Sequence, residues 1–152
     1  MKYLGEQLST FNKQMAYAMA NYQSHGKKIG QFKNIVISGL GGSGITGKII
    51  KSYYLDKINI PVETVSDYQL PKFVNADTLV ILCSYSGNTE ETLSAYHDAK
   101  AKGANCLTVS VGGKMSDLAA ADGLLTYRAE GGYQPRVAFG YPITYVFLIF
   151  AE

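Results

Sequence analysis

One apolar run and the turn that follows it constrain the fold of this chain more than any other stretch. Residues 78–83, TLVILC, form an apolar, β-branched run of strand length, and the chain then changes at once to the polar turn 84–89, SYSGNT. Helix-forming residues follow from Glu90, with Thr89 in the N-cap position. A strand therefore leads through a hydroxyl-rich turn into a helix start, where unpaired N–H groups can hold an anion.

Four more apolar runs of strand length occur along the chain, with turns and helical segments between them. They lie at residues 35–38, 62–65, 106–111 and 124–127. Strands that alternate with helical segments in this way are typical of right-handed βαβ units. We therefore predict an α/β fold: a doubly wound, five-stranded parallel sheet in the flavodoxin-like order 2-1-3-4-5, flanked by helices.

A helix is predicted near the N-terminus, at residues 6–22, where apolar side chains recur at helical spacing. We expect this stripe to cover a sheet face or a partner subunit. His25 and Gly26 are expected to end the helix, so residues 1–30 would form an N-terminal helix and connection before the α/β domain at 31–152. The stripe consists of Leu8, Phe11, Met15, Met19 and Tyr22.

The last helix, predicted to begin at Pro142, is apolar on every side. A helix of this kind should be buried all round. The chain stops inside it, at Glu152, without a glycine or a cap. We therefore expect a fragment truncated before a further domain, or a domain whose partner covers this helix. The alternative is a complete small protein that packs this helix in a homodimer.

Composition argues against several classes of partner. The chain has 152 residues, of which 47% are hydrophobic and 17% charged, enough for one sizeable core. Its net charge of +2, without a cluster of lysines or arginines, argues against nucleic acid. No signal peptide or apolar run of transmembrane length is present, so we expect no membrane partner and a cytoplasmic location.

The cysteines and histidines suggest structural roles. Cys83 and Cys106 fall within predicted strands, where a thiol acts as a small buried hydrophobe, so both are expected to be reduced. His97 should point away from the strand ends, and His25 should lie at a helix end. Neither histidine has the spacing of a metal site, so no metal is expected.

The strand order brings two polar turns together. In the order 2-1-3-4-5 the first and third strands are neighbours, so the turns that follow them share one edge of the sheet. One phosphate could receive hydrogen bonds from Ser43, Ser84, Ser86 and Thr89, with Gly42 exposing a backbone N–H group. The alternative is that these hydroxyls serve only turns and caps.

Two nucleotide fingerprints overlap the glycine-rich turn after the first strand. Residues 39–44 satisfy G-x-G-x-x-G, but Glu63, the candidate for a ribose hydroxyl, lies within a strand rather than at its end. Residues 42–48 approach a P-loop, but Ile49 replaces the hydroxyl residue that would hold magnesium. We therefore expect no cofactor, and a nucleotide-dependent enzyme is the less favoured class.

Four motifs carry a resemblance to a known family. They are GGSG at 41–44, DYQLP at 67–71, SYSGNTEET at 84–92 and YQPRVAFGY at 133–141. From about Ile35 to its last residue the chain resembles the sugar isomerase, or SIS, domain, and more narrowly the amino-terminal half of the bifunctional phosphoglucose/phosphomannose isomerases. The resemblance implies a five-stranded parallel sheet, a hexose 6-phosphate ligand, a homodimer, and active sites built from several segments.

The same resemblance implies roles for individual residues. Ser43, Ser84, Ser86 and Thr89 would bind the phosphate, and Arg136 would face the reacting end of the sugar as a catalytic cation. The reaction would interconvert glucose 6-phosphate or mannose 6-phosphate with fructose 6-phosphate. The family's base glutamate would lie in a missing C-terminal SIS domain, so this chain would hold the phosphate and lack the general base.

Other readings of the site remain open. Arg136 could be an exposed arginine of a surface loop, and Glu130 is a second candidate for a base. Glu90 and Glu91 are expected to stabilise the helix dipole instead. The alternative function is a regulatory, sugar-phosphate-sensing SIS module without catalysis.

Overall fold

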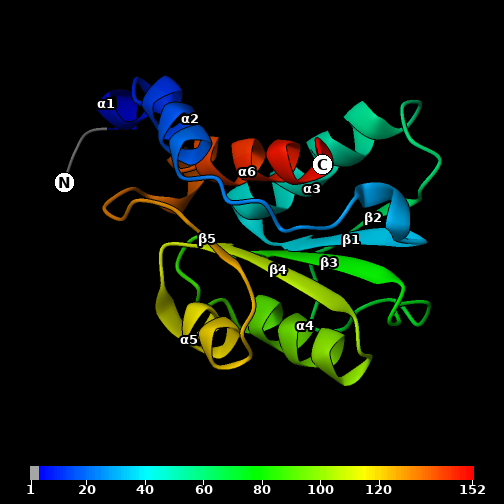
Figure 1. Cartoon of the computed structure of the whole chain (residues 1–152). Coiled ribbons are helices and arrows are strands. Elements are labelled where there is room, and N and C mark those ends of the chain that lie inside the picture. Colours follow the sequence, from blue (N-terminus) through cyan, green and yellow to red (C-terminus); the bar gives the residue numbers. More distant parts are fainter. Residues whose placement is uncertain (1–3) are drawn as a thin grey trace.

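A single parallel sheet forms the centre of the molecule (Figure 1). The computed structural model describes residues 4–152. The sheet has five strands in the order β2-β1-β3-β4-β5, and every adjacent pair is parallel, so the predicted fold and order are confirmed. The strands are β1 (Asn34–Gly39), β2 (Val62–Val65), β3 (Thr78–Cys83), β4 (Asn105–Ser110) and β5 (Thr126–Arg128).

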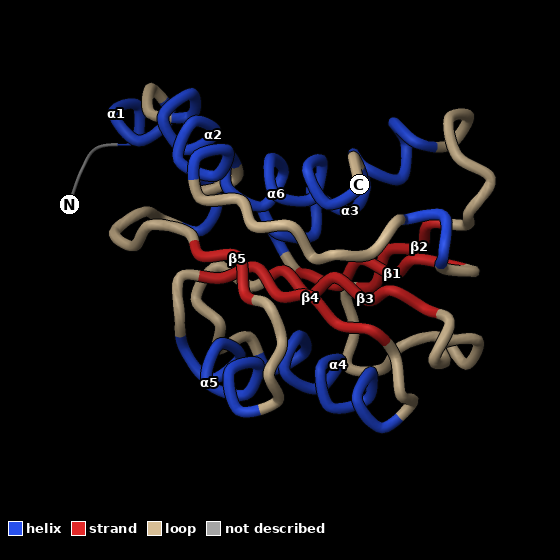
Figure 2. Tube along the Cα trace, in the orientation of Figure 1, coloured by secondary structure: helices blue, strands red, loops and turns tan. Residues whose placement is uncertain are grey.

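Helices cover both faces of the sheet (Figure 2). On one face lie α2 (Phe11–Ala20), α3 (Gly41–Tyr54) and α6 (Gly140–Phe150); on the other lie α4 (Glu90–Ala101) and α5 (Gly113–Ala121). The short helices are α1 (Leu4–Leu8), η1 (Ile29–Gln31) and η2 (Pro135–Val137). Because both faces are covered, all six residues of β3 are buried, which explains its unbroken apolar run.

The last helix, α6, obtains its burial from this chain. Nine of its eleven residues are buried, as its apolar sequence predicts. It lies between α2 and α3 above the sheet (Figure 1). Only Phe147 and Leu148 are half-buried. A further partner is therefore not needed to explain this helix.

The predicted N-terminal helix is two helices. Residues 9 and 10 interrupt it, because Ser9 Oγ donates to Glu6 O at 2.8 Å and Thr10 Oγ1 donates to Gln7 O at 2.6 Å. Such local bonds compete with helix continuation. The second helix ends at Ala20, so the prediction that His25 and Gly26 end it was wrong.

Four of the five side chains of the apolar stripe do not face the sheet, whereas Tyr22 is half-buried and stacks on Tyr127 of β5. Leu8, Phe11, Met15 and Met19 are exposed, whereas the fully buried residues of α2 are Gln14 and Ala18. The Gln14 side-chain amide donates to Val137 O at 2.8 Å and accepts from Gly140 N at 2.9 Å. These two bonds satisfy a buried polar side chain, so a glutamine takes the place in the core that the sequence assigned to the stripe.

Candidate functional site

The two polar turns are neighbours at the carboxyl edge of the sheet. The register pairs Gly39 with Cys83, the last residues of β1 and β3, so the turns after these strands begin side by side. A small cavity lies there, lined by Ser43 from α3, Tyr85 from the turn after β3, and Ser110 at the end of β4. The backbone therefore places the two turns next to each other, as predicted.

The turn of residues 84–89 is organised around the Ser84 hydroxyl, which is buried. Ser84 Oγ accepts the Gly87 N–H at 3.1 Å and pairs with Thr89 Oγ1 at 2.8 Å. Ser86 is exposed, and its Oγ accepts the Asn88 N–H at 3.1 Å. Two of the predicted ligands, Ser84 and Thr89, are thus in direct contact, and Ser86 lies in the same turn.

Thr89 occupies the N-cap position of α4, as predicted, but its side chain does not cap the helix. Its hydroxyl points to Ser84 instead. The first N–H groups of α4 therefore receive no cap from this side chain and keep the positive end of the helix dipole. Glu90 and Glu91 lie in this first turn, where their charge favours the dipole.

Close packing against the next loop fixes this turn. A β-carbon on Gly87 would lie 1.8 Å from Gly112 O, and the φ angle of Gly87 is +70°. The Gly87 carbonyl accepts the Met115 N–H at 2.9 Å, and Asn88 Oδ1 accepts the Lys114 N–H at 3.0 Å. Only glycine allows this approach, so the turn of residues 84–89 is held against the start of α5.

The glycine-rich segment after β1 is helical. We expected a turn whose glycines expose N–H groups, but α3 already begins at Gly41. A β-carbon on Gly44 would lie 2.8 Å from Gly39 O, and one on Gly47 would lie 3.0 Å from Thr64 Cγ2. These two glycines therefore serve close helix–strand packing. Ser43 remains at the carboxyl edge, in the first turn of α3.

The loop that carries Arg136 lies on this same helix start. A β-carbon on Gly42 would stand 3.0 Å from Pro135 O and 3.4 Å from Arg136 Cα. The Arg136 side chain is exposed, and its Nε and Nη2 atoms donate to Gln134 Oε1 at 3.1 and 2.9 Å. Gly42 therefore makes room for the loop, and the backbone of Arg136 lies beside the residue before Ser43.

Sequence reasoning missed Tyr85 as a link between the turn and this loop. Its hydroxyl donates to Glu130 O at 2.8 Å and accepts the Tyr133 N–H at 3.1 Å. Burial raises the pKa of Tyr85 above its usual value, so the hydroxyl stays protonated at neutral pH. In the sequence, the position of Tyr85 between Ser84 and Ser86 was the one indication that it lies at the site.

Two charged residues extend the same edge. Arg128 Nη1 donates to Val111 O at 3.1 Å and lies beside Gly112, which packs on the turn of residues 84–89. The Glu130 carboxylate accepts the hydroxyl of buried Tyr141 at 2.7 Å. Burial, followed by this bond, raises the pKa of Tyr141, so the tyrosine hydroxyl is the donor.

The remaining candidates lie elsewhere. Glu63, the candidate for a ribose hydroxyl, forms an ion pair with Lys51 Nζ at 2.9 Å. His25 is not at a helix end: its side chain is 2% exposed, and Nε2 lies 3.6 Å from a Glu152 oxygen. His97 is exposed on α4 and stacks edge-on against Tyr96.

Cys83 and Cys106 are buried free thiols, as predicted, and burial raises their pKa values to about 12 and about 11. Within residues 4–152, no group of three or more His, Cys, Asp or Glu side chains is arranged to hold a metal ion. In the same range, no helix combines the length and the apolar character that crossing a membrane requires.

Known proteins resemble this chain in sequence. The family model described as "SIS domain" matches residues 28–131. The chain is 45% identical over 139 residues to a bifunctional phosphoglucose/phosphomannose isomerase of Caldicellulosiruptor bescii, covering 91% of this chain and 41% of that protein. It is 47% identical over 114 residues to the protein of the same description in Thermoplasma acidophilum, covering 75% and 34%.

Solved structures share the fold. The C-terminal domain of glucosamine-fructose-6-phosphate aminotransferase from Francisella tularensis aligns with a TM-score of 0.74 at 14% identity, over 99% of this chain and 48% of that one. The chain therefore spans less than half the length of each of these three proteins.

Proposed function

The chain belongs to the SIS domain family, and from this premise we propose that it is the sugar-phosphate-binding part of an aldose–ketose isomerase for glucose 6-phosphate and mannose 6-phosphate. The observation that carries the proposal is the Ser84–Thr89 hydroxyl pair at an uncapped start of α4. Relatives at 45% and 47% identity are described as isomerases of these two sugars.

The hydroxyl pair sets the direction of the donors. Ser84 Oγ already accepts the Gly87 N–H, so in the bound state its own proton goes to Thr89 Oγ1. The Thr89 proton is then free for a phosphate oxygen, and the chain of hydroxyls strengthens that bond. Ser84 thus positions the donor, and Thr89 contacts the phosphate.

The remaining donors are neutral as well. Ser86 and Ser43 add hydroxyls, and the first N–H groups of α4 add oriented dipoles. Hydrogen bonds to a charged phosphate contribute about 1.5–3 kcal/mol each. A dianion can therefore be held without a lysine in the site.

The proposed chemistry needs a base, an acid and a cation. A base removes the proton next to the carbonyl carbon, an enediolate forms, and the proton returns to the neighbouring carbon. Arg136, permanently charged and beside the start of α3, would stabilise the developing oxyanion. We assign the base to the part of the longer protein that this chain does not contain.

We further propose that a second SIS domain covers the groove beside Arg136. This outer groove has a volume of about 420 Å³ and is lined mainly by Leu8, Phe11, Ile45 and Phe139, with Arg136 at its margin. Exposed apolar side chains of this kind mark interaction surfaces. A domain docked there would also enclose the reacting end of the sugar.

Sedimentation velocity tests the groove. In this chain alone a second copy supplies the second domain, so we expect a dimer that Ile45→Glu converts to a monomer. Leu55→Glu is the matched control, because Leu55 is 78% exposed and does not line the groove. A monomeric parent chain, or equal effects of both variants, would contradict the docking proposal.

A thermal-shift panel tests the ligand. Glucose 6-phosphate, mannose 6-phosphate and fructose 6-phosphate should each raise the Tm, whereas glucose, NAD and ATP should not. A coupled assay should show no turnover by this chain alone. Stabilisation by a nucleotide without stabilisation by any hexose phosphate would overturn the proposal.

A further inference from the structure

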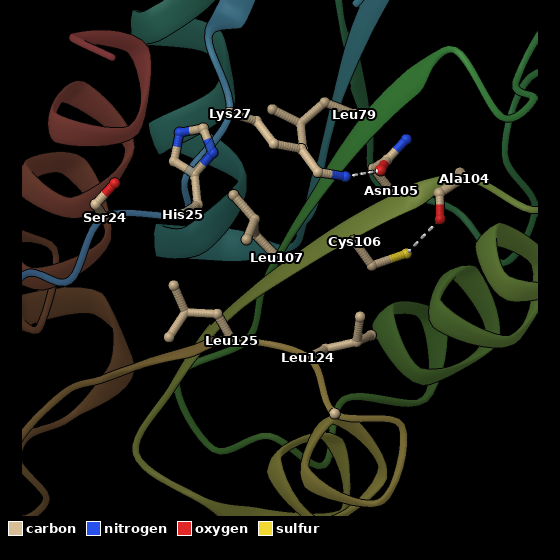
Figure 3. A pocket seen from close by; sticks show the side chains of 11 residues that line it. Ser24, His25, Lys27, Leu79, Ala104, Asn105, Cys106, Leu107, Leu124 and Leu125 are labelled. Atoms are coloured by element: carbon tan, nitrogen blue, oxygen red, sulfur yellow. Dashed lines mark hydrogen bonds between the residues drawn. The ribbon is translucent and has the colours of Figure 1, made fainter.

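A second cavity lies at the opposite edge of the sheet, where the strands begin (Figure 3). It has a volume of about 420 Å³, and we call it the edge cavity. Asn105 opens β4 on one side of it, and Leu124 and Leu125 precede β5 on the other, with Lys27 reaching in from the N-terminal connection. Its volume falls within the range of small-molecule sites, about 300–1,000 Å³.

The cavity exists because β5 starts late. Pairing of β4 with β5 begins at Thr108 and Thr126, three residues after β4 itself begins. The Thr108 N–H donates to Leu125 O at 3.2 Å, and Ser110 O accepts the Ala129 N–H at 3.0 Å. Even-numbered residues of β4 therefore direct their backbone groups towards β5.

Cys106 has no strand opposite it on that side. By the same alternation its N–H and C=O groups point into the gap, as does the Leu125 N–H. Within residues 4–152, the structure contains no backbone bond between Cys106 and Leu125. Backbone N–H and C=O groups that face a cavity without a protein partner favour a polar guest.

Lys27 and Asn105 make one end of the cavity polar, and Ser24 and His25 line another part of it (Figure 3). Lys27 Nζ donates to Asn105 Oδ1, and Asn105 Nδ2 donates to Ala76 O at 2.8 Å, which fixes the amide (Figure 3). None of the residues that line the cavity is acidic. The Lys27 end therefore carries a positive charge, whereas Ser24 Oγ, in another part of the lining, donates to the Glu152 carboxylate at 2.8 Å.

The apolar part of the lining consists mainly of Leu79, Leu107, Leu124 and Leu125, together with the Cys106 thiol. Burial raises the pKa of this thiol to about 11, so it is neutral at physiological pH. The Lys27 end of the cavity thus suits an anion, and the leucine side chains suit a hydrocarbon body.

We propose that the edge cavity is a binding site for a small organic carboxylate with an apolar body, separate from the phosphate site. Lys27 binds the carboxylate, and the leucines contact the body of the ligand. Strand β4 spans both sites, because Asn105 lines the edge cavity and Ser110 lines the cavity beside Ser43. Five residue steps along a strand separate them, or about 17 Å. One sugar phosphate therefore cannot occupy both.

Benzoate is the probe, followed by ¹H–¹⁵N NMR of the 152-residue chain. Saturable shifts should appear at the amides of Cys106 and Leu125. Benzyl alcohol has the same ring without the charge and should bind about tenfold more weakly, since a bond to a charged group contributes about 1.5–3 kcal/mol. Lys27→Met should weaken benzoate binding by a similar factor.

Lys28→Met is the matched control, because Lys28 is the exposed neighbour that does not line the cavity. It should leave benzoate affinity unchanged. Absence of saturable shifts at the two amides in millimolar benzoate would overturn the site. Equal affinity for benzyl alcohol, or equal effects of the two lysine variants, would overturn the recognition of an anion. Hexose phosphate binding is not involved, so either proposal can fail alone.

Discussion

Gly42 lies so close to Pro135 that a β-carbon on it would stand 3.0 Å from the Pro135 carbonyl oxygen. This contact joins the start of α3, which carries Ser43, to the loop that carries Arg136. The two predicted ends of a sugar phosphate site are therefore connected through backbone packing, and a glycine at position 42 leaves room for the loop.

Gly42→Ala should separate binding from stability. Alanine is favoured over glycine within a helix by about 1 kcal/mol, which offsets part of the contact with Pro135, so the free energy of unfolding should change little. The displaced loop should lower glucose 6-phosphate affinity about fivefold, or roughly 1 kcal/mol. Calorimetry and urea unfolding measure the two effects. Gly30→Ala, with no neighbouring atom within 4 Å, should leave affinity unaltered.

Thr89→Val removes the proposed phosphate donor at nearly constant volume. Affinity for glucose 6-phosphate should fall about tenfold or more, since a bond to a charged group contributes about 1.5–3 kcal/mol. The start of α4 should persist, because this side chain does not cap it. Thr126→Val is the control, as it breaks a comparable 2.7 Å hydroxyl pair with Thr108. Equal affinities in the two variants would remove Thr89 from the site.

Gly87→Ala should be strongly destabilising. The new β-carbon would lie 1.8 Å from Gly112 O, and the φ angle of residue 87 is +70°, so the turn of residues 84–89 and the loop before α5 must separate. We expect a loss of more than about 3 kcal/mol in urea unfolding. Gly123→Ala has a similar φ of +68° with nothing within 4 Å, and should cost only about 1–2 kcal/mol. Similar losses in both would show that backbone strain alone matters.

Asp98→Asn should make the free energy of unfolding depend less on pH in the acid range. Hydrogen bonds from Lys102 and from the Leu70 N–H hold the pKa of Asp98 below its usual value of 3.8. The unfolded chain takes up the proton at higher pH, so this stabilisation is present above about pH 3.8 and is lost as the pH falls through the folded-state pKa.

At neutral pH the Asp98→Asn variant should therefore be less stable by about 1 kcal/mol, and the difference should shrink on acidification. Urea unfolding at several pH values measures it. Asp117→Asn, at an exposed position on α5, is the control, and its free energy of unfolding should follow that of the parent protein at every pH. A difference for Asp98→Asn that grows towards low pH would contradict the assignment.

The sheet and its order were predictable because their signals are local. The apolar run of β3 needs burial on both faces, and a parallel sheet under helices supplies it. The hydroxyl-rich turn after it was predictable for the same reason, since the chain changes character within one residue, between Cys83 and Ser84. The sequence by itself therefore determined the fold, the edge that carries the polar turns, and the family.

Tertiary structure decided which groups face one another. Gln14 is buried because it bonds to Val137 and Gly140, which lie more than 120 positions further along the chain. Met15 and Met19 of the apolar stripe are left exposed. The hydroxyl of Thr89 pairs with Ser84 instead of capping α4. The edge cavity depends on where β5 begins to pair with β4. Periodicity reports how apolar a helix face is, but contacts between distant segments determine whether that face is covered, and no local pattern records them.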